Sequence, residues 1–309
     1  MTMVDSVFFF YLGTIGYFLS FLFYLFHVVL GGAKAEAEAE AQRGNDSRRL
    51  GITAESTVTA GRIAWGKLAT RTGWVAVTIA TIGVVMRVIE LGRTSEWTLT
   101  VFLPVTTTYE TLTFFAWLIS LIYLIMERRY PIKPVGMIVT GAALVMLSFA
   151  ASPSISPADV RPVVPSLQSY WLVIHVLFMV VGFGFFTVGF GANALFLWAR
   201  RRGKQESLLK KIEQMSYRAI ALGFPFYGIG GLVLGGIWAK QAWGAYWEWD
   251  PKETAMLAAW LVYAVYLHAR FRWGWKDLKV AWLGIAGYLA VLYAWVGINY
   301  FVASLHSFT

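Results

Sequence analysis

The sequence predicts an all-α integral membrane protein that crosses the membrane with about eight helices. Hydrophobic residues make up 58% of the chain and charged residues only 14%, and the mean hydropathy is +0.60. This composition is too apolar for a soluble globular protein. The apolar residues also lie in long runs, many near the roughly 20 residues that a helix needs to cross the hydrocarbon core. Basic residues gather in every second connection between these runs, which is typical of cytoplasmic loops.

The runs give one predicted transmembrane helix each. In chain order they cover residues 6–30, 73–91, 108–126, 134–151, 167–198, 217–238, 251–269 and 280–302. The first run has no basic segment before it and no small-residue cleavage site after it. It is therefore predicted to be a retained helix and not a signal peptide.

The connections set the predicted orientation. Those rich in Lys and Arg, and so placed in the cytoplasm, are 31–72, 127–133, 200–211 and 270–279. Those with few basic residues, and so placed outside, are 92–107, 152–165 and the stretch between the sixth and seventh runs. Because the two kinds alternate without exception, both termini are predicted to lie on the extracytoplasmic side.

The segment 31–72 divides the chain into two predicted parts. Residues 1–72 comprise the first transmembrane helix and a cytoplasmic linker, and residues 73–309 form the remaining transmembrane domain. The linker contains an Ala-Glu repeat at 35–41. Because Ala and Glu are strong helix formers, the linker is either a solvated extension of a helix or a flexible connection.

Charge and cysteine content exclude two classes of function. The formal net charge of +9 could suit nucleic acid, but the basic residues lie where membrane orientation requires them, so no nucleic-acid partner is predicted. The chain has no Cys. It therefore cannot use thiols of its own for redox chemistry, hold a metal through thiolates or attach a prosthetic group through sulfur.

The most unusual stretch is 243–253, in the outer connection before the seventh run. It contains three Trp and one Tyr, interleaved with Gly and charged residues. Aromatic residues favour membrane interfaces, so one interpretation is an aromatic belt. The other is a shelf of flat apolar faces beside polar groups, which suits a large planar ligand. Composition alone leaves both interpretations open.

Several motifs resemble one known family. Trp-Gly-x-x-Trp-x-Trp-Asp at 243–250 resembles the tryptophan-rich signature of haem-handling proteins in cytochrome c maturation. The segments that resemble the CcsA (ResC) family in particular are DPKET at 250–254, YLHAR at 266–270, LHS at 305–307, PVTTTYETL at 104–112 and SLQSYWLVIHV at 166–176. The resemblance runs from about residue 104 to the C-terminus, and the first hundred residues carry little of it.

The resemblance implies a function in cytochrome c maturation at the plasma membrane. The chain would bind haem b non-covalently, deliver it to the outer face and attach it to the Cys-x-x-Cys-His thiols of apocytochrome c. A CcsB (ResB) membrane protein would be its partner in a two-protein cytochrome c synthase. A haem transporter that does not perform the attachment, and a b-type electron-transfer cytochrome, remain as alternatives.

The histidines are the candidate ligands of haem iron. His175 lies near the outer end of the fifth run, and His306 lies just beyond the outer end of the eighth. Both are thus at the level of the Trp-rich stretch, which is compatible with a pocket in which two imidazoles bind one iron. The resemblance maps the two outer histidines of the family onto the same residues. It maps the family's Trp-rich loop onto four further positions, Trp243, Trp247, Trp249 and Asp250.

The other two histidines are predicted near the cytoplasmic side. His268 lies about 26 Å along the helix from Pro251, and the resemblance makes it a ligand that receives haem inside the membrane. His27 lies at a similar depth, so depth alone would allow both residues to bind one haem. The resemblance assigns the second inner ligand to the CcsB partner instead, and His27 is left out of the predicted site.

Two charged groups have a structural explanation. Asp250, Pro251 and Glu253 fit the N-cap, first and third positions of a helix, so Asp250 is predicted mainly to cap the seventh run. Arg87 and Glu90 have the i, i+3 spacing of an ion pair on one helix.

Overall fold

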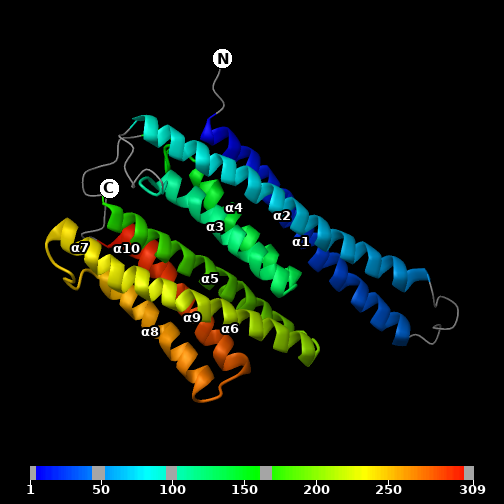
Figure 1. The fold of residues 1–309 in the computed structure, drawn as a ribbon. Coiled ribbons are helices and arrows are strands. Elements are labelled where there is room, and N and C mark those ends of the chain that lie inside the picture. The colour runs from blue at the N-terminus through cyan, green and yellow to red at the C-terminus, as the bar shows by residue number, and fades with distance from the viewer. Residues whose placement is uncertain (1–4, 44–52, 95–102, 161–168, 303–309) are drawn as a thin grey trace.

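A computed structural model describes residues 5–43, 53–94, 103–160 and 169–302, and these residues form helices without any strand (Figure 1). Eight helical segments are long and apolar enough to cross a membrane: Ser6–Leu30, Ala64–Thr94, Thr108–Arg129, Lys133–Ala150, Tyr170–Arg201, Glu206–Trp243, Pro251–Phe271 and Asp277–Gly297. The predicted all-α membrane fold and its eight spans are therefore confirmed.

The described residues contain ten α-helices and two π-helical segments. Their bounds are α1 (Ser6–Arg43), α2 (Thr53–Thr94), α3 (Thr108–Arg129), α4 (Lys133–Ala150), α5 (Tyr170–Arg201), α6 (Glu206–Gly228), η3 (Ile229–Leu234), α7 (Gly235–Trp243), α8 (Pro251–Phe271), α9 (Asp277–Leu292), η4 (Tyr293–Gly297) and α10 (Ile298–Phe301). The segments η3 and η4 are π-helical. They interrupt the sixth and eighth spans without ending them.

The first two helices are much longer than a membrane span. α1 has 38 residues, which at about 1.5 Å per residue gives about 57 Å, against about 30 Å of hydrocarbon. Part of the hairpin formed by α1 and α2 extends past the other helices (Figure 1). The Ala-Glu repeat belongs to this extension of α1, so the first interpretation of the linker is correct for the repeat. The boundary predicted at residue 72 falls inside α2.

The spans form two groups. α1 packs against α2 and α4, and α3 packs against α2 and α4. In the second group α5 packs against α6 and α9, and α8 packs against α9 and α6. α5 also contacts α3 and α4 and so joins the groups (Figure 1). α5 and α6 approach closely at Gly182, where an added Cβ would lie 2.8 Å from the backbone N of Tyr227.

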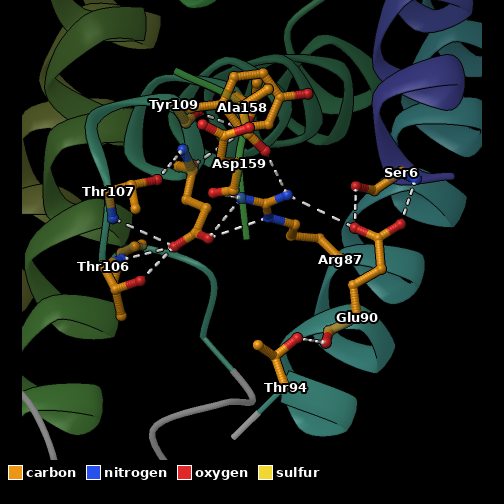
Figure 2. Close-up of polar contacts among 12 residues, drawn as sticks. Ser6, Arg87, Glu90, Thr94, Thr106, Thr107, Tyr109, Ala158 and Asp159 are labelled. Carbon is orange, nitrogen blue, oxygen red and sulfur yellow. Dashed lines mark hydrogen bonds and ion pairs between the residues drawn. The ribbon is translucent and has the colours of Figure 1, made fainter. Parts of the chain in front are cut away.

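A buried ionic cluster connects α1, α2 and α3 of the first group near the start of α1 (Figure 2). Arg87 of α2 is 1% exposed and forms an ion pair of 3.0 Å with Glu110 of α3. Its Nη1 donates to the carbonyl oxygen of Ala158 (2.9 Å) and its Nη2 to that of Asp159 (3.1 Å). The predicted pair with Glu90 is confirmed at 3.6 Å. The sequence did not show that the buried Glu110 is the closer partner.

Glu110 also begins α3. Its Oε2 accepts from the backbone N–H of Thr106 (3.0 Å) and Thr107 (3.3 Å), while the Thr107 hydroxyl accepts from the Glu110 N–H at 3.2 Å. This is a capping box, which satisfies N–H groups that a helix start otherwise leaves without partners. One carboxylate therefore both starts α3 and neutralises Arg87.

Loss of this carboxylate is expected to destabilise the fold. Glu110→Ala leaves the Arg87 guanidinium buried without its closest counter-charge, and breaking a buried ion pair typically costs about 3–5 kcal/mol. Glu110→Gln should lower stability less, because its amide oxygen can still accept from the cap N–H groups. The measurement is the thermal denaturation midpoint of the protein in detergent. An Ala variant as stable as the parent would contradict this role.

Candidate functional site

The Trp-rich stretch forms a tight connection between α7 and α8. α7 ends at Gly244, whose φ of 94° lies in the left-handed region that favours glycine. Asp250 then caps α8: its Oδ2 accepts from the Lys252 N–H at 3.0 Å, and Glu253 Oε2 accepts from the Asp250 N–H at 3.3 Å. The predicted capping role of Asp250 is confirmed. Gly244 at the start of the connection and the Asp250 cap at its end therefore fix its backbone.

A pocket lies at this end of the second helix group. It is lined by residues of α5, η3, α7, α8 and the Trp-rich stretch, namely His175, Gly231, Gly235, Gly236, Trp238, Ala239, Trp247, Glu253 and Met256. Its volume is about 260 Å³, part of which is open to solvent. The fold thus brings His175 and Trp247, two of the predicted site residues, to one cavity.

His175 is held by the polypeptide that precedes the Trp-rich stretch. Its Nδ1 lies 2.8 Å from the carbonyl oxygen of Gly230. Its ring is parallel to that of Trp238, with an interplanar angle of 1° and a centroid separation of 6.0 Å. Trp238 is 2% exposed and meets the edge of Trp243 at 5.2 Å. Trp243 does not line the pocket but contacts Trp238, which does.

Sequence reasoning missed Trp238 as a site residue. It is the last residue of the predicted sixth run, 217–238, where a Trp is ordinary. The signal that could have found it is its position after the glycines at 228, 230, 231, 235 and 236, since small residues permit close helix approach. Glu253 was recognised only as a capping residue, although its buried side chain also lines the pocket.

Trp247 and Trp249 have different environments. The two rings meet edge to face at 5.6 Å. Trp247 lines the pocket, and its Nε1 is buried with no hydrogen-bond partner among the residues that the structure describes. Trp249 is 68% exposed and does not line the pocket. The three tryptophans therefore do not form one continuous flat shelf.

His306 lies outside the described residues. The end of the described chain nevertheless lies beside the start of α8, because α10 packs against α8. Lys252 Nζ donates to Asn299 Oδ1 at 2.8 Å. The eighth span thus ends near the Trp-rich stretch, as the sequence predicted.

His268 and His27, both predicted near the cytoplasmic side, lie on helices of different groups. His268 is an exposed side chain in the last turn of α8, edge to face with Trp273 at 4.9 Å. His27 lies on α1 against Gly66 of α2, where an added Cβ would be 3.0 Å from its Nδ1. α1 and α8 belong to different helix groups (Figure 1). The arrangement that depth alone allowed, with both residues on one haem of one chain, is not formed.

The chain was compared with known proteins. Residues 105–306 match the family described as cytochrome C assembly protein. The cytochrome c biogenesis protein CcsA of Chlamydomonas reinhardtii is 37% identical over 214 residues, which cover 66% of this chain and 60% of the relative. CcsA of Trieres chinensis is 33% identical over 282 residues, covering 79% of this chain and 88% of the relative.

A solved structure shares the fold. It is the cytochrome c haem lyase CcmF, with a TM-score of 0.62 and 17% identity, over 94% of this chain and 47% of that chain. At this identity the likeness concerns the helical architecture alone. The sequence relationship is closer and covers the segment that carries the pocket. The chain therefore belongs to the CcsA family of cytochrome c biogenesis proteins.

Proposed function

We propose that this protein holds haem b non-covalently at its extracytoplasmic face and, with a CcsB-type partner, presents it for attachment to apocytochrome c in the plasma membrane. The observation that carries the proposal is the pocket that joins His175 to Trp238 and Trp247. It lies within the segment that matches the family. It combines an imidazole, an indole N–H without a partner and apolar ring faces, which are groups suited to a tetrapyrrole with acidic side chains.

Each of these residues is assigned its own role in binding haem. His175 and His306 would hold the iron, Trp238 would keep the His175 ring in its plane, and Trp247 could donate its buried N–H to an acceptor on the ligand. Part of the space that these residues line is open to solvent. A ligand held there would leave one edge where another protein can reach it.

The attachment step requires groups from outside this chain. Haem, when bound, supplies the vinyl groups to which thiols add. Because this chain has no Cys, both thiols must come from the apocytochrome. The residues described here bind and orient, and the reacting atoms belong to the ligand and the substrate.

Reconstitution tests the function directly. The protein is expressed together with a CcsB-type partner and a c-type reporter in a host without its own maturation system. Covalent haem on the reporter, seen by haem staining after denaturing electrophoresis, is the expected result. Haem-loaded protein with no covalent product would instead identify a transporter or a b-type cytochrome.

The proposed orientation predicts the outcome of reporter fusions. Alkaline phosphatase fused at the C-terminus should be active, because that end is placed outside the cytoplasm. A fusion after Arg202, in a basic connection placed inside, should be inactive. If both results are reversed, the pocket faces the cytoplasm and the proposed outer site is wrong.

Haem content is expected to depend on the aromatic faces. Trp247→Ala or Trp249→Ala should lower the haem-to-protein ratio of the purified protein, and Phe at either position should lower it less, because stacking needs a flat apolar face. Trp247 should show the larger effect, since it lines the pocket and Trp249 does not. Equal losses for Ala and Phe at Trp247 would assign its role to the buried N–H.

A further inference from the structure

We infer that the π-helical segment η3 positions His175 by fixing the proton on Nδ1, so that Nε2 is the nitrogen available to iron. The inference rests on the proposed function only where iron is concerned. The position of the proton is a property of this chain without any ligand, and it can be measured there.

The acceptor determines the tautomer. A carbonyl oxygen can only accept a hydrogen bond, so the 2.8 Å contact between His175 Nδ1 and Gly230 O requires the hydrogen to lie on Nδ1. A neutral imidazole carries one ring N–H. Its Nε2 therefore keeps the lone pair, which is the form in which an imidazole binds a metal.

The π-helix provides this acceptor. Within η3 the hydrogen bonds have the wider π-helical spacing, and the Gly235 N–H donates to Gly230 O. A carbonyl oxygen has two lone pairs and can accept from both Gly235 and His175. At residue 230 an added Cβ would lie 2.8 Å from the Cβ of Phe178 and 2.9 Å from the backbone N of Met179. Glycine thus allows the carbonyl to approach α5.

Two further contacts restrict the ring plane. An added Cβ at Gly235 would lie 3.1 Å from both Cε1 and Nδ1 of His175. The parallel Trp238 ring lies at 6.0 Å. The hydrogen bond and both contacts come from residues 230–238, which lie far along the chain from α5 yet adjoin the Trp-rich stretch. This segment therefore orients the imidazole before any ligand arrives.

The arrangement has a chemical consequence. A hydrogen bond from the distal ring nitrogen to a carbonyl raises the basicity of the coordinating nitrogen. A more basic axial ligand favours ferric over ferrous iron and so lowers the reduction potential. Weakening the bond between His175 and Gly230 should therefore raise the potential of a haem held by His175.

The first test uses protein without haem. The chain has four histidines, so the ring nitrogens can be observed by ¹⁵N NMR of histidine-labelled protein in lipid and assigned with single His→Gln variants. The expected result is a protonated Nδ1 and an unprotonated Nε2 for His175. A protonated Nε2 with a bare Nδ1 would overturn the inference, and the tautomer itself is read from the unmodified protein.

The second test uses Gly235→Ala, whose methyl group should push the imidazole away from Gly230 O. The Nδ1 signal should shift, and the midpoint potential of bound haem should rise. Gly141→Ala is the control, because its Cβ would meet only the Phe21 ring at an ordinary 3.4 Å, far from the pocket. If Gly235→Ala shows the parent's NMR signals and potential, the positioning role is wrong.

The two proposals can fail separately. If His175→Ala retains the haem spectrum of the parent, His175 is not an iron ligand and the proposed binding site is wrong, whatever its tautomer. If His175→Ala loses that spectrum while the haem-free protein has Nε2 protonated, the proposed site remains and only the positioning by η3 is wrong.

Discussion

His175→Ala and His306→Ala are each expected to abolish cytochrome c formation in the reconstituted system. Removing one imidazole would take away an iron ligand, and the described residues that line the pocket include no imidazole other than His175. Covalent haem on the c-type reporter is the measurement. Accumulation of both variants in the membrane must be equal to that of the parent for the comparison to be valid.

Adding free imidazole to the His175→Ala variant tests whether the lost function is that of an iron ligand. A small free ligand can occupy the position vacated in His175→Ala and should restore part of the cytochrome c yield. Restoration should be incomplete, because free imidazole is not attached to α5 and loses translational and rotational freedom when it binds. If either variant forms cytochrome c at the parent rate without added imidazole, the histidine that it lacks is not an essential ligand.

The transmembrane architecture could be predicted because it depends on local properties. Length, apolarity and the position of Lys and Arg are read within a single span and its flanks. The cap formed by Asp250 and Glu253 was also predictable, because its residues are three apart along the chain. The sequence left open how far the first two helices extend, since helix-forming residues continue beyond the hydrophobic run and nothing in that run marks their end.

The contacts inside the site could not be read from the sequence. Trp238 and Gly235 act on His175 from another helix, and no periodicity links positions so far apart in the chain. A π-helical segment has no compositional signature, although such segments are frequent at functional sites. The ion-pairing role of Glu110 likewise depends on Arg87, a residue on a neighbouring helix. Depth along the helices left open whether His27 and His268 share one haem, and the packing of α1 and α8 in separate helix groups answers it.

The second large effect is expected on haem content and cytochrome c yield when His268 is replaced. His268→Ala is expected to remove an inner haem signal and lower the cytochrome c yield clearly, whereas His27→Ala should leave both unchanged. His268 is exposed in the last turn of α8. A side chain of a neighbouring protein could therefore provide the second ligand to an iron that His268 binds. His27 is half-buried between α1 and α2 in the other helix group.

Both variants are made in the protein co-expressed with a CcsB-type partner, and haem is quantified by difference absorption spectra of the purified complex. The His27 variant is the matched control, because it removes the same imidazole at a similar depth. Its ring lies against Gly66, so its loss also tests whether disturbing the α1–α2 contact alone affects haem content. Should both variants lose the same haem signal, the inner haem would depend on both histidines. Since one chain keeps them on separate helix groups, that outcome would require either two copies of this chain or an indirect effect through α1, and would refute the assignment of the second ligand to the partner.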